Sequence, residues 1–172
     1  MSTTNLIRFG GLAAAIAGVL RGINSFLPSG VPSLETSLLY LLTEIFILFG
    51  MIGLYGFQHE ESRLWGFWGF VLTTIGLLTI RTGEIAGVGL YSFGAAIFAI
   101  GLWAFAVGTW IADKLPRWAS SCWLIAPILG FVGYFAPGLN LLFVLSGLLF
   151  GIGSAGAGIR VWSAPFQGGK SL

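Results

Sequence analysis

Four ionisable side chains lie inside, or at the edge of, stretches that are otherwise apolar, and their types set what chemistry this chain can do. Glu44 is the charged residue within residues 38–50, LLYLLTEIFILFG. Arg21 interrupts a first apolar stretch, and Arg81 and Glu84 follow a third one. In such places a carboxylate and a guanidinium can pair with each other or hold a charged ligand, and the acid can also carry a proton.

Few other side chains in the sequence could support catalysis or hold a cofactor. The chain has one histidine, His59, one cysteine, Cys122, and two lysines, Lys114 and Lys170. Haem held by two histidines, copper and zinc need more ligands than these. Histidine is also missing from the apolar stretches, where it would be needed to activate a nucleophile. We therefore expect no metal and no cofactor, and an enzyme is the least favoured class of function.

The composition indicates a lipid bilayer as the medium around this chain. Of its 172 residues, 56% are hydrophobic and 8% are charged, and the mean hydropathy is +0.94. A soluble domain carries roughly 25% charged residues, so this chain has too little polar surface to stay in water. Its formal net charge of +2 is too small to indicate a nucleic-acid partner. We expect a multi-pass protein of a prokaryotic plasma membrane.

Six stretches are long enough to cross the hydrocarbon core of a bilayer, which takes about 20 apolar residues in a helix. Helices are expected because lipid cannot bond to bare backbone groups, and the alternation typical of a barrel is missing. The sequence predicts an all-α bundle, one integral membrane domain over residues 1–172, with spans at about 6–27, 34–57, 64–82, 85–111, 118–136 and 139–162. Helix-breaking or polar residues separate the spans at 28–32, 58–63, 81–83, 113–117 and 137–138.

The spans are expected to pair as three helical hairpins, with both chain termini in the cytoplasm. An excess of Lys and Arg marks the cytoplasmic side of a membrane protein. The side that holds both termini collects six of the basic residues, namely Arg8, Arg63, Lys114, Arg117, Arg160 and Lys170. The other side has only Arg21 and Arg81. Tryptophans, whose rings favour the interface, follow the same bias at positions 65, 68, 110, 118 and 162.

Helical periodicity predicts that Arg21 and Glu44 face other helices and not lipid. On the first span, Arg21 shares its face with small residues, namely Gly10, Ala14, Ala17 and Gly18. This small-xxx-small pattern lets helices approach closely in a membrane. On the second span, Glu44 belongs to a polar stripe with Ser37, Tyr40, Tyr55 and Gln58.

A glycine-rich segment, GIGSAG at residues 151–156, fits the dinucleotide-binding pattern G-x-G-x-x-G. That function needs a strand before the segment and a soluble helix after it. Because the segment lies inside the sixth predicted span, we interpret it as a helix-packing stripe.

Two interpretations of the charged cluster stay open. In the first, the cluster is a structural clamp on the first three spans, in which Glu44 pairs with Arg21 or with Arg81. In the second, it surrounds a polar cavity, open to the outside, that binds a ligand or a proton. An anion or a carboxylate-bearing amphiphile would suit the arginines. The candidate ligand-binding residues are Arg21, Tyr40, Glu44, Arg81 and Glu84.

Two classes of function fit these observations. The favoured class is a non-catalytic binding protein, or a scaffold or assembly subunit that self-associates through its glycine faces or joins a larger membrane complex. The alternative is a transporter for a small molecule or for protons, with Glu44 as its ionisable site. Six short spans enclose at most a narrow cavity, so such a transporter is expected to act as an oligomer.

Overall fold

The computed structural model describes residues 3–27, 33–136 and 138–165, and these residues form six α-helices and no strand. The helices are α1 (Thr3–Asn24), α2 (Leu34–Gln58), α3 (Arg63–Ala86), α4 (Tyr91–Ala112), α5 (Arg117–Phe135) and α6 (Asn140–Ser163). Each helix is long and apolar enough to cross a membrane, which confirms the predicted all-helical class. The predicted break at residues 28–32, Pro137 and the basic residue Lys170 lie outside the described residues.

The boundary between the third and fourth helices differs from the predicted break at residues 81–83. Helix α3 continues past this point to Ala86 and ends at Gly87, whose φ is +66°. Glycine adopts this left-handed conformation without strain, and the N–H of the residue after it bonds back 2.9 Å to a carbonyl of the last helical turn. As a result, Arg81 and Glu84 lie one turn apart within a single helix.

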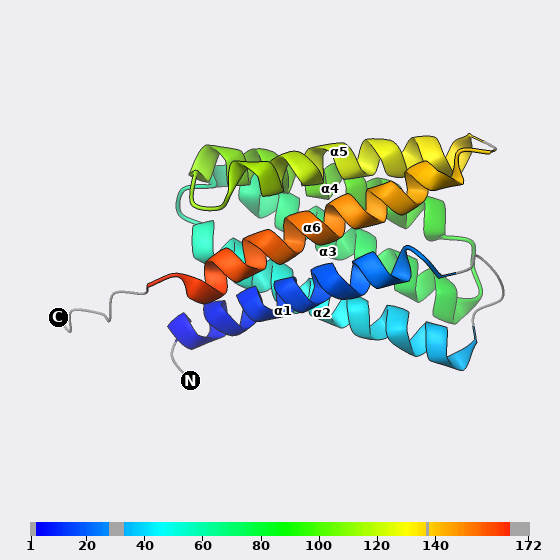
Figure 1. Cartoon of the computed structure of the whole chain (residues 1–172), viewed down its shortest axis with the longest axis horizontal. Helices are drawn as coiled ribbons and strands as arrows, with labels where there is room; N and C mark the ends of the chain where they lie inside the picture. Colours follow the sequence, from blue (N-terminus) through cyan, green and yellow to red (C-terminus); the bar gives the residue numbers. More distant parts are fainter. Residues whose placement is uncertain (1–2, 28–32, 137, 166–172) are drawn as a thin grey trace.

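The helices run back and forth along one long axis (Figure 1). Helix α1 packs on α2, α3 on α4, and α5 on α6, while α1 also packs closely on α6 and so joins the first pair to the last. The start of α1 and the finish of α6 lie at the same end of the bundle, the terminal end (Figure 1). Helices α1, α3 and α5 finish at the opposite end, the far end, where α2, α4 and α6 begin.

Glycine lets α1 approach both of its neighbours. Gly10 of α1 faces Gly53 of α2, and Gly18 faces Gly151 of α6; a Cβ atom at any of these positions would overlap the partner's backbone. The small-residue face of α1 is buried, as the sequence predicts. Gly151 belongs to the GIGSAG segment, which is helical and packs on α1. The interpretation of that segment as a helix-packing stripe is therefore confirmed.

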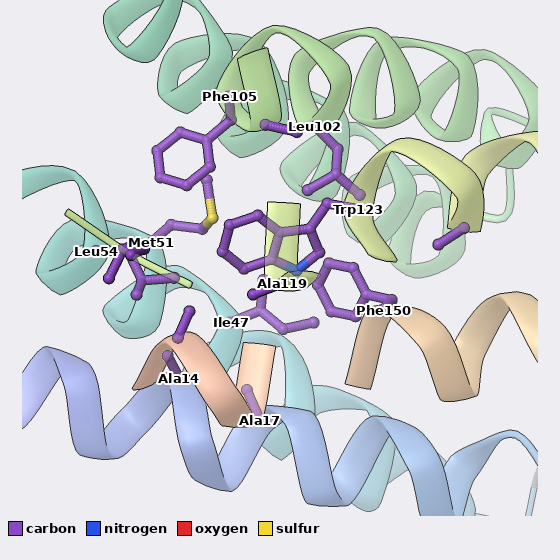
Figure 2. Close-up of a cluster of buried hydrophobic side chains, with 14 of the residues drawn as sticks. Ala14, Ala17, Ile47, Met51, Leu54, Leu102, Phe105, Ala119, Trp123 and Phe150 are labelled. Atoms are coloured by element: carbon purple, nitrogen blue, oxygen red, sulfur yellow. The ribbon is translucent and has the colours of Figure 1, made fainter. Parts of the chain in front are cut away.

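The hydrophobic core fills the middle of the bundle, with aromatic side chains on one side and small ones on the other (Figure 2). Phe105 of α4 and Trp123 of α5 are fully buried, with ring centroids 5.7 Å apart. The Trp123 indole N–H donates to the Ser154 hydroxyl over 3.2 Å, so its polar atom is satisfied. Ala14 and Ala17 of α1 belong to the same cluster. This packed layer fills the bundle between its terminal end and its far half.

The α3–α4 pair meets the other helices through side chains. Within the pair the backbones touch, since a Cβ atom at Gly76 would overlap the backbone of α4. Toward the other helices, Gln58 of α2 donates to Thr109 of α4 over 2.7 Å, and the Trp103 indole of α4 donates to the Leu124 carbonyl of α5 over 2.8 Å. A seam of side-chain contacts thus separates the α3–α4 pair from the remaining helices.

Candidate functional site

A cavity of about 380 Å³ lies in the far half of the bundle, and residues from all six helices line it. An engineered core cavity of about 150 Å³ already holds benzene, and small-molecule sites have volumes of about 300–1,000 Å³. The cavity is therefore large enough for a small ligand. The five candidate residues from the sequence all line it: Arg21, Tyr40, Glu44, Arg81 and Glu84.

Arg81 of α3 holds two carboxylates at one edge of the cavity. Its Nε lies 2.6 Å from Oε2 of Glu44 on α2, and its NH1 lies 2.9 Å from Oε2 of Glu84, one turn further along α3. The side chains of Arg81 and Glu44 are 15% and 17% exposed, whereas that of Glu84 is 45% exposed. Shielded charge-assisted bonds of this kind are among the stronger polar contacts in proteins. The three residues, Glu44, Arg81 and Glu84, form an ionic triad that ties α2 to α3.

Arg21 lines the same cavity from α1 but lies outside the triad. It forms no ion pair with any residue in the described part of the chain, so the structure resolves the choice left open by the sequence: Glu44 pairs with Arg81. The Arg21 side chain extends beside Gly147 of α6, where the absence of a side chain leaves room for it. Ser25 caps the turn by donating to the Arg21 carbonyl over 2.8 Å. No hydrogen bond from the guanidinium to another described residue is found, so its donors are available to a ligand in the cavity.

A buried amide fixes the position of α1 next to α2 at this depth. The Asn24 Nδ2 donates to the Thr43 hydroxyl over 2.9 Å, and that hydroxyl donates to the Leu39 carbonyl over 2.7 Å. Asn24 and Thr43 are 4% and 3% exposed. Because Asn24 lies one turn beyond Arg21, and Thr43 directly precedes Glu44, this bond sets the relative height of the two charged groups.

Aromatic side chains from α4, α5 and α6 form a second part of the cavity lining, the aromatic wall, which the sequence alone did not reveal. Phe98 and Phe150 contribute rings with centroids 5.8 Å apart, and Phe131, Phe135 and Phe143 complete the aromatic wall. These residues carry no charge to single them out. The one available signal was periodicity, because the lining residues of α4 fall on one helical face, at Tyr91, Ser92, Ala95, Phe98, Ala99 and Leu102.

Small side chains create the empty space. Close-packed protein interiors leave few voids larger than a water molecule, so a cavity of this size needs short side chains on facing helices. Small residues of α4, α5 and α6 provide them, namely Ala95, Ala99, Ala126, Gly130 and Gly147.

Two tyrosines form part of the rim. The ring centroids of Tyr91 on α4 and Tyr134 on α5 lie 5.8 Å apart, and the Tyr134 hydroxyl lies 3.1 Å from that of Ser92. Tyr91, Tyr134 and Glu84 are all partly exposed while lining the cavity. The cavity is therefore open at this rim, and a ligand has a route into it.

Comparisons of the chain with protein families, with curated proteins and with solved structures found no match. The chemistry of the cavity is then the guide to function. The charged groups come from α1, α2 and α3, and most of the aromatic lining comes from α4, α5 and α6. Such a division complements a molecule with a charged group and an apolar body.

Proposed function

We propose that the protein binds a small amphiphilic molecule with an acidic group, and that the cavity is its binding site. One observation carries this proposal: Arg21 lines a largely apolar cavity and has no carboxylate partner among the described residues. An uncompensated charge in apolar surroundings is costly. An acidic group on a ligand would offset this cost, while the aromatic wall would take the ligand's apolar part.

The use of glycine in the bundle supports binding over a scaffold function. A scaffold that self-associates through glycine faces needs those faces on its outer surface. Gly10, Gly18, Gly53 and Gly151 are buried within the chain's own helix contacts. These glycines therefore serve the internal packing of the bundle and are not available for self-association.

The proposed setting is a membrane, with both termini in the cytoplasm and the cavity open to the outside. The described basic residues outside the cavity support this orientation, because Arg8, Arg63, Lys114, Arg117 and Arg160 all lie toward the terminal end. Both cavity arginines lie in the far half. The excess of basic residues thus falls on one side of the bundle, as it does on the cytoplasmic side of membrane proteins.

Transport is a second candidate function, favoured by the position of the cavity on the seam. The α3–α4 pair is closely packed internally but meets the other helices through side chains. A movement of this pair against the rest would open the cavity toward the terminal end, and the Glu44–Arg81 contact would break. Octanesulfonate, a permanent anion, tests this in proteoliposomes. Uptake above that of empty liposomes, and lost in Glu44→Gln, would support transport; no uptake would leave binding alone.

A thermal-shift measurement in a non-ionic detergent tests the binding function. Octanoate should stabilise the protein in a concentration-dependent way, and octanol, with the same chain and no charge, should do so much less. Arg21→Gln should weaken octanoate binding about tenfold, the value of a charge-assisted bond of roughly 1.4 kcal/mol. Arg160→Gln, which removes an exposed arginine near the terminal end, is the matched control. Equal stabilisation by octanoate and octanol would contradict the proposal.

A further inference from the structure

The charges around the cavity balance in number but not in arrangement. Two arginines and two glutamates line it. Arg81 contacts both carboxylates, at 2.6 and 2.9 Å, so the triad as a whole carries one excess negative charge. Arg21 carries the compensating positive charge without an ion-pair partner among the described residues. The cavity therefore has a separate positive site on α1 and a negative site on α2 and α3.

Glu84 is the accessible part of the negative site. Its side chain is 45% exposed, against 17% for that of Glu44. Oε2 of Glu84 pairs with Arg81, and no hydrogen bond or ion pair of Oε1 with another described residue is found. Glu84 can thus accept a further hydrogen bond, or lie beside a cation, without giving up its bond to Arg81.

A ligand that carries only a negative charge would leave the cavity unbalanced. Once an anion neutralises Arg21, the triad retains its excess negative charge in surroundings where charge is poorly screened. A ligand with a positive group as well would neutralise both sites. Building on the proposed acidic amphiphile, we infer that the ligand is zwitterionic, with its acidic group at Arg21 and an ammonium group at Glu84.

The tyrosines that line the cavity fit an ammonium group. Tyr40, Tyr91 and Tyr134 line the cavity together with Glu84, and the rings of Tyr91 and Tyr134 lie 5.8 Å apart. Ammonium groups, and quaternary ones above all, are attracted to the faces of such rings. The apolar part of the ligand then extends to the aromatic wall formed by α4, α5 and α6. A free amphiphile and a membrane lipid headgroup share this chemistry.

Calorimetric titration of the purified full-length protein in a non-ionic detergent tests the inference with probes of one chain length. The probes are octanoate, octyltrimethylammonium and an octyl betaine that carries both groups. The betaine should bind about tenfold more tightly than octanoate, the gain of one additional charged contact. A lysophospholipid with an ethanolamine head distinguishes the two sources. Tighter binding than the betaine indicates a membrane lipid, and weaker binding a free amphiphile.

Variants identify the group that recognises the ammonium. Glu84→Gln should weaken betaine binding about tenfold and leave octanoate binding undiminished, because octanoate has no cation to lose. Arg21→Gln should weaken both of these probes and spare octyltrimethylammonium. Glu60→Gln, which removes an exposed carboxylate at the terminal end, is the control for a change of net charge.

The results separate the inference from the function on which it rests. If octanoate binds through Arg21 and the betaine binds no more tightly, the zwitterionic ligand is wrong and the acidic amphiphile stands. If none of the probes binds, both are wrong. If glycine betaine, which has no chain, binds as tightly as the octyl betaine, the amphiphilic class itself is overturned.

Discussion

Nε of Arg81 lies 2.6 Å from Oε2 of Glu44, and this contact connects α3 to α2 across the seam. Because Arg81 also contacts Glu84 at 2.9 Å, the loss of the arginine would leave two carboxylates facing each other. The contact therefore serves two purposes: it holds α3 against α2, and it neutralises one of the two acidic charges inside the cavity.

Removing either member of this pair should destabilise the bundle, and removing the arginine should cost more. Breaking a buried pair costs about 3–5 kcal/mol, and the partial exposure of these side chains reduces this to about 1–3 kcal/mol for Glu44→Gln. Arg81→Gln should exceed that value. Unfolding in mixed detergent measures both. The double variant should be more stable than the sum of the two losses predicts; additive losses would show that the pair is not coupled.

Glycine positions on α1 should differ sharply although they lie on one helix. Gly18→Ala should destabilise the protein by about 1–3 kcal/mol, because its Cβ would overlap the Gly151 carbonyl of α6. Gly22→Ala, one turn later, meets only a Leu148 methyl group at 3.8 Å. It should be neutral or stabilising by up to about 1 kcal/mol, because alanine favours the helix. The same unfolding measurement applies, and equal effects of the two changes would contradict the close packing of α1 on α6.

Filling the cavity should abolish binding without touching a charged group. Ala95→Phe places a ring among the lining residues of α4, so octanoate should no longer stabilise the protein in the thermal-shift measurement. Its neighbour Ala96 is absent from the cavity lining, and Ala96→Phe should retain the octanoate effect. If Ala95→Phe keeps that effect, the ligand lies elsewhere.

Acid should weaken a contact at the terminal end. A hydrogen bond from Lys114 holds the pKa of Glu61 below its ordinary value of 4.5, and the two groups lie 2.5 Å apart. A depressed carboxyl pKa contributes stability that is present above the ordinary value and is lost as the pH falls through the folded value. The contribution is small and sensitive to salt, because both side chains are about two-fifths exposed.

Glu61→Gln reports on this contact directly. The stability of the variant should fall less steeply than that of the original protein as the pH drops below 4.5, in unfolding measurements at low salt. Glu60→Gln, the adjacent exposed acid, serves as the control. Parallel pH profiles for all three proteins would show that the Glu61–Lys114 pair does not stabilise the fold.

Labelling with a membrane-impermeant thiol reagent tests the proposed orientation. In a Cys122→Ala background, Gly89→Cys lies in the α3–α4 connection at the far end, where a side chain meets no neighbouring atoms. Glu60→Cys lies in the α2–α3 connection at the terminal end. The reagent should label Gly89→Cys in intact cells and Glu60→Cys only after the cells are opened. The reverse pattern would place the cavity on the cytoplasmic side.

The helices were predictable from the sequence because their apolar length and the polar residues between them are local properties. The end of α3 was not, since the sequence offers glycines at 83, 87 and 89. Only the three-dimensional arrangement shows that Gly83 is buried inside the helix and that Gly87 takes the left-handed conformation that ends it.

The charged half of the site was also visible in the sequence, because ionisable residues are rare in apolar stretches. The partner of Glu44 could not be predicted. Arg21 and Arg81 are both expected on the same side of the membrane, and the choice between them depends on which helices are neighbours. The aromatic wall was missed because Phe98 or Phe143 looks, in sequence, like any other phenylalanine facing lipid or core. Its role follows from the alanines and glycines of the same helices, which leave space beside the rings.

Photoaffinity labelling of the cavity tests the central claim, that Arg21 draws an acidic amphiphile into the bundle. The probe is a medium-chain fatty acid with a diazirine at the end of its chain, and labelled peptides are identified by mass spectrometry. Labels should fall on the aromatic wall, at Phe98, Phe131 or Phe143, and should be lost in Arg21→Gln but kept in Arg160→Gln. Labels confined to outward-facing residues such as Ile45 and Phe49, and unchanged in Arg21→Gln, would contradict it.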